Sequence, residues 1–572
     1  MLKHKNTKTR KTQKQIKIQK CFSVSVYDFI MSIKQKNQNN NLPMILIILD
    51  GWGIAKPSSG NAIALSKTPY LDKIIKDYPS AKLCAYGKCV GLPPAQDGNS
   101  EAGHINIGAG RVVEQDAVKI CKTINDGTFF KNSAFLEAIK HVEKNKSALH
   151  LMGMLSNGMS AHSDPDHLLA LVTLARGYNV KKVYLHLFTD GRDSPQYAAL
   201  KLIESVQRDY LINERVATIM GRFYAMDRKK KWGRTEKAYN ALVLGKGKKA
   251  KSPQDAITKA YNSGENDEFI QPYVIESNGR QLPRINDGDS VIFFNLRSDR
   301  ARQLAKAFVQ HDFNKINPGA FKRQKVLKDL KFAAMTDFGP DLDSILSAYP
   351  SADLKATLPM ALRDLKQLYI AEKEKHSHVT YFFNGGYARP VAGESRIILE
   401  SPNVRSYDET PAMNSAGLTG AVIKNFTPQP PILIRRGGGA KRQGRGWKYD
   451  FTVLNFAAPD MVAHTGNLEA GIECCRHIDK HLSRIVNAYL ELEGTVLITA
   501  DHGNIEEMIN LETGEIDTEH SSSPVPFIIV NKKLKNKIKL KKSGVLADIA
   551  PTILALIGRE KPREMTGKSL IK

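Results

Sequence analysis

The sequence has few cysteines and no long apolar run. Its 572 residues include only six cysteines, and none of them stand in a Cys-x-x-Cys pair. A chain of this size with so few cysteines has no disulfide framework, which favours a reducing compartment and predicts a cytoplasmic protein. The longest uninterrupted apolar run covers residues 44–49, whereas a membrane-spanning helix needs about 20 residues. We therefore expect no transmembrane segment and no membrane partner.

The sequence has few acidic residues for its number of basic ones. It contains 58 Asp and Glu and 84 Lys and Arg, which gives a formal net charge of +26. Two segments, 1–42 and 435–448, hold much of the excess. Such segments can bind nucleic acid or another anionic surface. Neither interleaves its basic residues with aromatic and base-reading groups, so a basic tail and a solvated loop are favoured. We expect residues 1–42 to be a disordered extension and the Pro- and Gly-rich insert 427–447 to be a surface loop.

The remaining composition is that of a globular protein. Hydrophobic residues make up 42% of the chain and charged residues 25%, which argues against a disordered, collagen-like or coiled-coil chain. At about 100–200 residues per domain, the length predicts roughly two to four domains.

Five apolar runs end in polar clusters, as buried strands of a parallel sheet do. The runs cover residues 44–49, 183–188, 290–294, 451–454 and 495–500. Helical patterns lie between some of them, at 168–176 and 194–209. This alternation predicts an α/β fold, in which ligands gather at the carboxyl ends of the strands.

Carboxylates and imidazoles cluster at these strand ends. Asp460 and His464 are four residues apart, so a helical turn would place both on one face. Asp501 and His502 directly follow the run 495–500. Either pair can bind a divalent metal. The alternatives are an unrelated aspartate and histidine in the first pair, and an aspartate that caps the next helix in the second.

Two further residues enlarge this set. Asp50 follows the first run and His520 lies in a polar loop, which makes three carboxylates and three imidazoles in all. These are enough ligands for two first-row divalent ions such as Mn²⁺ or Zn²⁺. Ions about 3.5–4 Å apart can clamp the entering and leaving oxygens of a phosphoryl transfer. The sequence therefore predicts a two-metal phosphotransfer site.

Ser100 is the candidate nucleophile for such a site. It follows the Gly- and Pro-rich segment 91–98. A serine at a helix start ordinarily serves as the N-cap. Beside a metal, its hydroxyl could instead be deprotonated and attack phosphorus, with the helix N-terminus favouring the incoming anion. Both interpretations stay open at this point.

A set of longer motifs completes the pattern. In chain order they are Asp50-Gly-Trp-Gly53, Gly98-Asn-Ser-Glu101 with Gly103-His104-Ile-Asn-Ile-Gly-Ala-Gly-Arg111, His162-Ser-Asp164, Thr189-Asp-Gly-Arg-Asp193, Pro459-Asp-Met461 with His464-Thr-Gly466, and Asp501-His-Gly-Asn504. Together they resemble the cofactor-independent phosphoglycerate mutases of the alkaline-phosphatase-like superfamily, over residues 43–570. The resemblance implies interconversion of 3-phosphoglycerate and 2-phosphoglycerate in glycolysis and gluconeogenesis. It also implies a phosphoserine intermediate, two divalent ions that are typically Mn²⁺, and no requirement for 2,3-bisphosphoglycerate.

The resemblance further implies a role for each matching residue. Ser100 would be the phosphorylated nucleophile, and Asp193 and Lys375 would take part in catalysis, with Lys373 as the alternative to Lys375. One ion would be held by Asp460, His464 and His520, and the other by Asp50, Ser100, Asp501 and His502. A substrate with a carboxylate and a phosphate needs several arginines, because guanidinium groups bind both anions bidentately. The implied substrate contacts are His162, Arg192, Asp193, Arg222, Arg228, Arg297, Arg300 and Lys375.

The resemblance also implies a domain arrangement. A metal-binding, doubly wound phosphatase-like domain would comprise residues 43–113 and 350–572, interrupted by an α/β phosphotransferase domain at 114–349. The expected partner is the small-molecule substrate, bound by a monomer that does not bind nucleic acid. Three alternatives stay open: a phosphatase or sulfatase of the same superfamily, a phosphopentomutase, and a nucleic-acid-binding protein that has lost catalysis.

Overall fold

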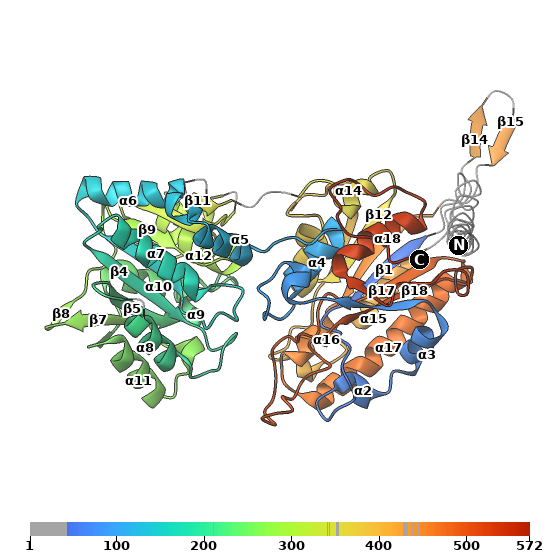
Figure 1. The fold of residues 1–572 in the computed structure, drawn as a ribbon, viewed down its shortest axis with the longest axis horizontal. Coiled ribbons are helices and arrows are strands. Elements are labelled where there is room, and N and C mark those ends of the chain that lie inside the picture. The colour runs from blue at the N-terminus through green and yellow to red at the C-terminus, as the bar shows by residue number, and fades with distance from the viewer. Residues whose placement is uncertain are drawn as a thin grey trace, which may run out of the picture. The chain divides into compact units, whose positions relative to one another are not determined.

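The computed structural model contains two compact units, each of them an α/β structure (Figure 1). The first unit is formed by the chain up to Glu114 and again from Asp353 to Lys572, and the second by Gln115–Ala352. The described residues are 43–209, 211–339, 341–342, 344–350, 354–426, 433–436, 439–442 and 447–572. The predicted extension 1–42 and much of the insert 427–447 lie outside them.

The first unit is built on an eight-stranded sheet. In spatial order its strands are β13 (Ser395–Leu399), β12 (Gln367–Glu372), β16 (Phe451–Phe456), β1 (Met44–Leu49), β17 (Thr495–Thr499), β18 (Val525–Val530), β2 (Ser80–Cys84) and β19 (Ser543–Val545). The strands from β13 to β17 run parallel, and β18 is antiparallel to both of its neighbours. The centre of the sheet is therefore parallel. The carboxyl ends of β1 and of its two neighbours, β16 and β17, lie at the same edge of the sheet.

Strand β1 lies between two layers of helices, and all six of its residues are buried. One face of the sheet is covered by α2 (Ala62–Ser66), α3 (Pro69–Asp77), α15 (Ser415–Asn425) and α17 (Leu468–Glu491), and the other by α4 (Ser100–Ala109), α14 (Leu358–Ala361) and α18 (Ile549–Leu556) (Figure 1). A strand covered on both faces needs apolar side chains throughout, which is why its sequence is a continuous apolar run.

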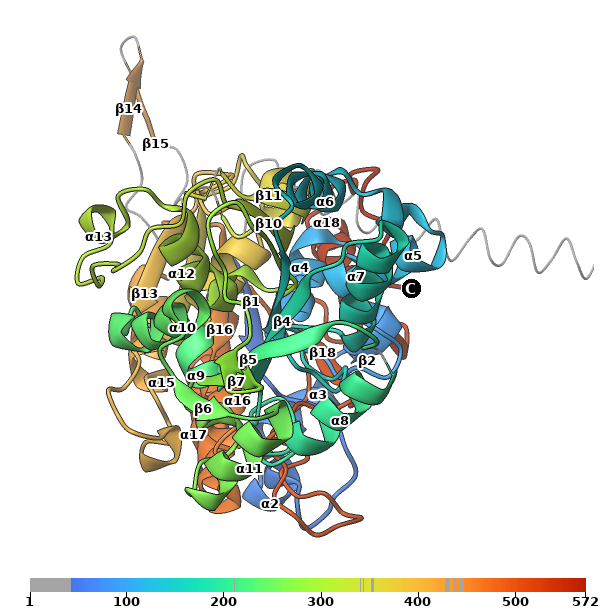
Figure 2. The same ribbon diagram turned by 90° about the vertical axis from the view of Figure 1, so that its left-hand side faces the viewer.

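The second unit contains a mixed nine-stranded sheet with a hydrophobic core on each face. Alternate residues of β3 divide between the cores: Leu149 and Leu151 belong to one, and Met152 and Met154 to the other. Helices α7 (Pro165–Gly177), α8 (Ala199–Asp209) and α11 (Pro253–Asn262) pack on the first core, and α10 (Trp232–Leu244) and α12 (Ser298–Val309) on the second (Figure 2). The strand order is β11 (Leu346–Tyr349), β10 (Lys331–Thr336), β9 (Ser290–Phe293), β3 (Leu149–Met154), β4 (Val183–Thr189), β5 (Arg215–Gly221), β7 (Tyr273–Ser277) and β6 (Lys248–Ala250), with β8 (Arg280–Gln281) paired to β7.

The predicted α/β fold is confirmed. Each of the five apolar runs forms a strand, and only the carboxyl ends differ, as where the run 451–454 extends to Phe456. The helix predicted over 168–176 lies within α7. The helix predicted from residue 194 begins only at Ala199, because Pro195 starts a turn in which the Ala198 amide donates to the Pro195 carbonyl.

Two features differ from the sequence analysis. The insert 427–447, predicted as a loop, contains the antiparallel pair β14 (Leu433–Arg436) and β15 (Gly439–Arg442). Leu433–Arg436 contains neither proline nor glycine, so it can form a paired strand although the insert around it is rich in both residues. A disulfide, which the cysteine count did not predict, joins Cys84 to Cys89. The turn after β2 brings their Cα atoms to 5.9 Å, within bonding range. Among the described residues, no helix has the length and apolarity that crossing a membrane requires.

Candidate active site

Ser100 opens helix α4 without serving as its cap. The side chain of Asn99 accepts the hydrogen bond from the Ala102 amide at 2.9 Å, so Asn99 is the N-cap and that interpretation of Ser100 is wrong. The Ser100 hydroxyl is therefore available for other contacts. Its Oγ lies 2.9 Å from Nε2 of His502 and 3.1 Å from Oδ1 of Asp50. The serine thus faces a carboxylate and an imidazole that the sequence analysis assigned to metal binding.

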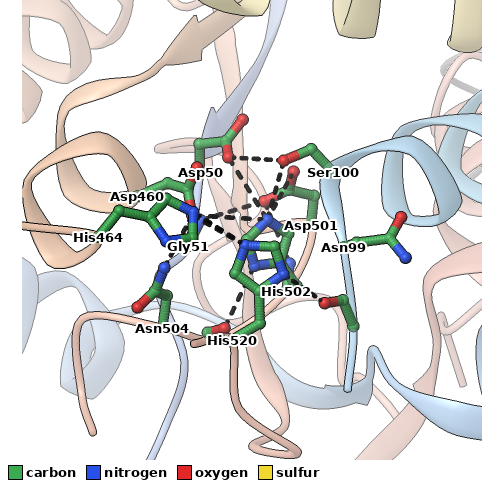
Figure 3. A network of polar contacts seen from close by, with 12 residues as sticks. Asp50, Gly51, Asn99, Ser100, Asp460, His464, Asp501, His502, Asn504 and His520 are labelled. Atoms are coloured by element: carbon green, nitrogen blue, oxygen red, sulfur yellow. Dashed lines mark hydrogen bonds and ion pairs between the residues drawn. The ribbon is translucent and has the colours of Figure 1, made fainter. Parts of the chain in front are cut away.

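The carboxylates come from three neighbouring strand ends. Asp50 follows β1, and Asp501 follows β17 beside it. Asp460 lies in α16 (Ala458–Ala463), which directly follows β16 on the other side of β1. Asp501 does not cap a helix, because its Oδ1 accepts from the amides of Gly51 at 3.2 Å and His502 at 3.1 Å. Figure 3 shows the three side chains converging on one point.

Three imidazoles complete the cluster. Nε2 of His464 and Nε2 of His520 lie 3.3 and 3.4 Å from Oδ1 of Asp460. Nε2 of His502 lies 3.5 Å from Oδ1 of Asp50 and 3.6 Å from Oδ2 of Asp501. The helical-turn pairing of Asp460 with His464 is therefore present, as Figure 3 also shows.

The orientation of two imidazoles suits a cation. Nδ1 of His464 donates to the Thr518 carbonyl at 2.7 Å, and Nδ1 of His520 donates to the Gly98 carbonyl at 2.8 Å. Because a carbonyl only accepts, Nδ1 carries a proton in each ring, and Nε2 is a lone pair whenever the ring is neutral, as it must be to bind a metal. The two Nε2 atoms face each other at 3.2 Å. Two such lone pairs side by side, next to a carboxylate, are what a metal ligand set presents.

Lys375 brings a positive charge to this cluster. Its buried Nζ lies 2.6 Å from Oδ1 of Asp50, 2.6 Å from Oδ2 of Asp460 and 2.8 Å from Oγ of Ser100. Lys373, the alternative, is exposed and pairs with Glu400 at 2.9 Å. Burial would raise the pKa of Asp50, but Lys375 and the hydrogen bond with His502 hold that pKa well below its ordinary value. Burial would lower the pKa of His502, but the neighbouring carboxylates of Asp501 and Asp50 raise that pKa to about 9, so its imidazole is charged without metal. The carboxylates of this site therefore favour bound cations.

The ligand atoms form two separate groups that share no residue. In one group, atoms of Asp460, His502 and His520 all lie within 4.8 Å of one another. In the other, atoms of Asp50, His104 and Asp501 do. Carboxylate oxygens with imidazole nitrogens suit first-row divalent ions. The cluster can therefore hold metal beside the Ser100 hydroxyl.

Sequence reasoning did not assign three residues that support this cluster. Nδ1 of His104 lies 2.8 Å from the Ser100 carbonyl and 3.1 Å from Oδ2 of Asp501. Asn455 donates from Nδ2 to Oδ2 of Asp50 at 2.6 Å. His104 stands in the Ser100 helix, and Asn455 stands in a strand that ends at the site. Their positions next to the predicted ligands could therefore have identified both from the sequence.

Glu506 is the third, and its sequence position carried no signal. Its carboxylate accepts from the Gly53 amide at 2.8 Å and from the Asn504 amide at 2.9 Å, and it also bonds the Ser521 hydroxyl. It therefore joins the loop after β1, the loop after β17 and the segment that carries His520. Asn504 in turn donates from Nδ2 to Oδ1 of Asp460 at 2.9 Å.

The second unit holds a separate polar cluster around Arg222. The buried guanidinium donates to Oδ2 of Asp193 at 2.9 Å and also to Asp190. The hydroxyl of Ser160 donates to Oδ2 of Asp193 at 2.6 Å. Burial would raise the pKa of Asp193, but Arg222 and the hydrogen bond from Ser160 hold it well below its ordinary value. Asp193 is therefore an ionised carboxylate fixed between an arginine and a serine.

The other predicted substrate residues surround this cluster. Arg228 pairs with Asp299 at 2.8 Å, and Nε of Arg297 lies 3.9 Å from the same carboxylate. Burial, together with the charges of Arg222 and its neighbouring arginines, lowers the pKa of Arg300 to about 9. So many guanidinium groups around few carboxylates favour a bound anion.

Two predicted substrate contacts differ in their surroundings. His162 is buried, and burial together with Arg222 and Arg297 lowers its pKa well below the ordinary value, so the ring is neutral. Arg192 is exposed and only 3.9 Å from Glu268. The structure thus groups Ser100 and Lys375 with the predicted metal ligands in the first unit. It groups the remaining predicted substrate contacts in the second.

Two family models match the chain. The BPG-independent PGAM N-terminus covers residues 120–340, which lie in the second unit. The metalloenzyme superfamily covers residues 440–561, which lie in the first. The two matches therefore divide the chain between the same two units as the cores do.

Known relatives match almost end to end. A 2,3-bisphosphoglycerate-independent phosphoglycerate mutase of Clostridium kluyveri is 46% identical over 535 residues, covering 93% of this chain and 99% of the relative. One of Clostridioides difficile is 45% identical, covering 92% and 99%. The crystal structure of Leishmania mexicana phosphoglycerate mutase at low cobalt concentration superposes with a TM-score of 0.78 at 28% identity, covering 94% of this chain and 98% of that one. By this similarity the chain belongs to the 2,3-bisphosphoglycerate-independent phosphoglycerate mutases, a family of isomerases in the alkaline-phosphatase-like metalloenzyme superfamily.

Proposed function

We propose that this chain interconverts 3-phosphoglycerate and 2-phosphoglycerate by transferring the phosphoryl group to Ser100 and back, without 2,3-bisphosphoglycerate. The observation that carries the proposal is the position of one hydroxyl. Oγ of Ser100 lies within 3.1 Å of a carboxylate, an imidazole and an ammonium group, those of Asp50, His502 and Lys375. An imidazole or carboxylate can take the hydroxyl proton, and the ammonium can stabilise charge on the transferring group.

Two divalent ions, which we propose to be Mn²⁺, would be held by the predicted ligands. Asp460, His464 and His520 would bind one, and Asp50, Ser100, Asp501 and His502 the other. When bound, the ions would lower the pKa of the Ser100 hydroxyl and polarise the phosphoryl oxygens. The buried carboxylates and the Nε2 lone pairs of His464 and His520 are the donors that Mn²⁺ accepts.

The cluster of the second unit would bind the glycerate. We assign Arg222, Arg228, Arg297 and Arg300, with His162 and the more exposed Arg192, to the substrate's carboxylate and phosphate. Guanidinium groups recognise both anions bidentately. Asp193, ionised and held by Arg222, would accept the proton of the glyceryl hydroxyl that attacks phosphoserine, and return it in the reverse direction. This gives residues 114–349 the role of a phosphotransferase domain.

We also propose that the enzyme is a cytoplasmic monomer whose partner is its substrate. Each unit has its own buried core among the described residues, as expected of a chain that folds without a partner. The low cysteine count supports the cytoplasm, although the Cys84–Cys89 disulfide is a feature that a reducing compartment would oppose.

The test is a coupled turnover assay on the full chain. Protein stripped by a chelator should convert 3-phosphoglycerate only after Mn²⁺ is added, with no 2,3-bisphosphoglycerate present. Free phosphate is measured in the same sample. Rapid release of phosphate would indicate a phosphatase instead, and a strict requirement for 2,3-bisphosphoglycerate would contradict the proposed mechanism.

A further inference from the structure

A third group of potential metal ligands lies in the second unit, among residues that the proposed reaction does not use. Cys121 lies in α5 (Asp116–Asn125), Asp164 is the N-cap of α7, and His167 is in the first turn of α7. One ligand atom from each of the three lies within 4.8 Å of the other two. None of these atoms belongs to the Ser100 site, which is in the first unit.

The spacing within this group fits a tetrahedral ion. Sγ of Cys121 lies 3.5 Å from Nε2 of His167. Zinc binds sulfur at about 2.3 Å and imidazole nitrogen at about 2.0–2.1 Å, so a tetrahedral angle separates the two ligand atoms by about 3.6 Å. The observed pair therefore needs almost no movement to share one ion. A thiol that donates to the imidazole would also give a short distance, so the distance alone does not decide between the two.

The charges and burial of the group support a cation. His167 is fully buried, and Cys121 and Asp164 are partly buried. Asp164 uses Oδ1 to accept from the Asp166 amide at 2.9 Å, and its second oxygen can coordinate while the cap is kept. A thiolate and a carboxylate together balance the two charges of a divalent ion. They also offset the positive end of the α7 dipole, which otherwise disfavours a cation there.

The donor set differs in kind from that of the Ser100 site. There the ligands are carboxylates and imidazoles, which suit Mn²⁺, whereas here one ligand is sulfur. Thiolate ligands select zinc over manganese and magnesium, and cobalt(II) substitutes for zinc in such sites. Three protein ligands leave a fourth position for water.

We propose that Cys121, Asp164 and His167 form a zinc site that fastens α5 to the start of α7. On binding, the S–H bond of Cys121 breaks, a zinc–sulfur bond forms, and the proton is released to solvent. The site would hold the first helix of the second unit against the helix that follows His162. Its role is structural, because none of its ligands belongs to the proposed reaction.

Cobalt(II) tests the proposal through a signal that the Ser100 site cannot give. Only a thiolate ligand produces the strong near-ultraviolet sulfur-to-cobalt charge-transfer absorption. Full-length protein stripped by a chelator and titrated with Co²⁺ should develop this band, and it should disappear when Zn²⁺ is added. Cys121→Ser should remove the band completely. Cys474→Ser, which changes a fully buried thiol in the first unit, is the matched control and should keep it.

A second variant separates loss of a ligand from loss of structure. Asp164→Asn keeps an N-cap, because asparagine caps as well as aspartate, but removes the carboxylate charge. It should weaken Co²⁺ binding at least about tenfold, the low end for a metal-site partner. Retained mutase turnover with Mn²⁺ would show that Cys121→Ser is folded. A wild-type protein that develops no band, or a band that persists in Cys121→Ser, would overturn the proposal.

Discussion

Nζ of Lys375 lies 2.8 Å from Oγ of Ser100. The same ammonium is 2.6 Å from a carboxylate oxygen of Asp50 and 2.6 Å from one of Asp460. Burial would lower the pKa of Lys375, but the carboxylates of Asp460 and Asp50 raise it above the ordinary value, so the group stays charged. A fixed positive charge beside the nucleophile can stabilise the negative charge that develops during phosphoryl transfer.

Replacing Lys375 should therefore impair turnover more than binding. Lys375→Met keeps the length of the side chain and removes its charge, and we expect kcat to fall by at least roughly 10²-fold. Lys373→Met is the matched control, since Lys373 is exposed and pairs with Glu400, and it should change kcat by less than about twofold. Equal kcat values for the two variants in steady-state assays would contradict this role of Lys375.

Asn99 should stabilise the protein only by capping the N-terminus of helix α4. Its side chain satisfies the Ala102 amide, so Asn99→Ala should lower the free energy of unfolding by about 1 kcal/mol. Asn99→Asp retains an acceptor and should stay within a few tenths of a kcal/mol, about the difference between good caps. Chemical denaturation of the metal-free proteins measures both. If the two variants were destabilised equally, the cap would not be the cause.

Glu506 should control metal affinity from outside the ligand set. It accepts from the amides of Gly53 and Asn504, and so aligns the loops that follow β1 and β17. We expect Glu506→Ala to weaken Mn²⁺ binding by about 10–100-fold, as for other groups that orient ligands. Calorimetric titration of the stripped protein measures the affinity. The neighbouring Glu507→Gln, at an exposed position, is the control, and an unchanged affinity in Glu506→Ala would contradict the expectation.

Glu372 should make stability depend on pH. Its carboxyl is buried at the end of β12, and burial raises its pKa to about 7. The native state therefore holds this proton over a range in which the unfolded state, with a pKa of about 4.3, has lost it. The free energy of unfolding should fall as pH rises from about 4.5 to about 7, by up to about 3 kcal/mol.

Glu372→Gln isolates this contribution. The amide can still accept from the Asn414 amide, which lies 3.1 Å from Oε1 in the wild type, but it does not titrate. The variant's free energy of unfolding should decline less over this pH range than that of the wild type. Parallel pH profiles for the two proteins would show that the proton is not held at Glu372.

Much of the fold and of the candidate site could be predicted because strand ends are visible in the sequence. Asp50 and Asp501 each follow an apolar run, and adjacency of their strands then places them together. The resemblance implied Lys375 with Lys373 as the alternative, but no sequence pattern separates the two, since both follow β12 and differ in burial. The sequence could not identify Glu506 either, because its role depends on amides that are distant in sequence. Contacts across loops are set by tertiary packing, which no local pattern encodes.

The most direct test of the central claim is mass spectrometry of Ser100 during turnover. Manganese-loaded enzyme is mixed with 3-phosphoglycerate, quenched in acid at short times and digested. The account predicts a phosphorylated peptide that contains Ser100, formed without 2,3-bisphosphoglycerate and as fast as turnover requires. Turnover at full rate with Ser100 unphosphorylated at every time point, and phosphate found on another residue, would contradict it.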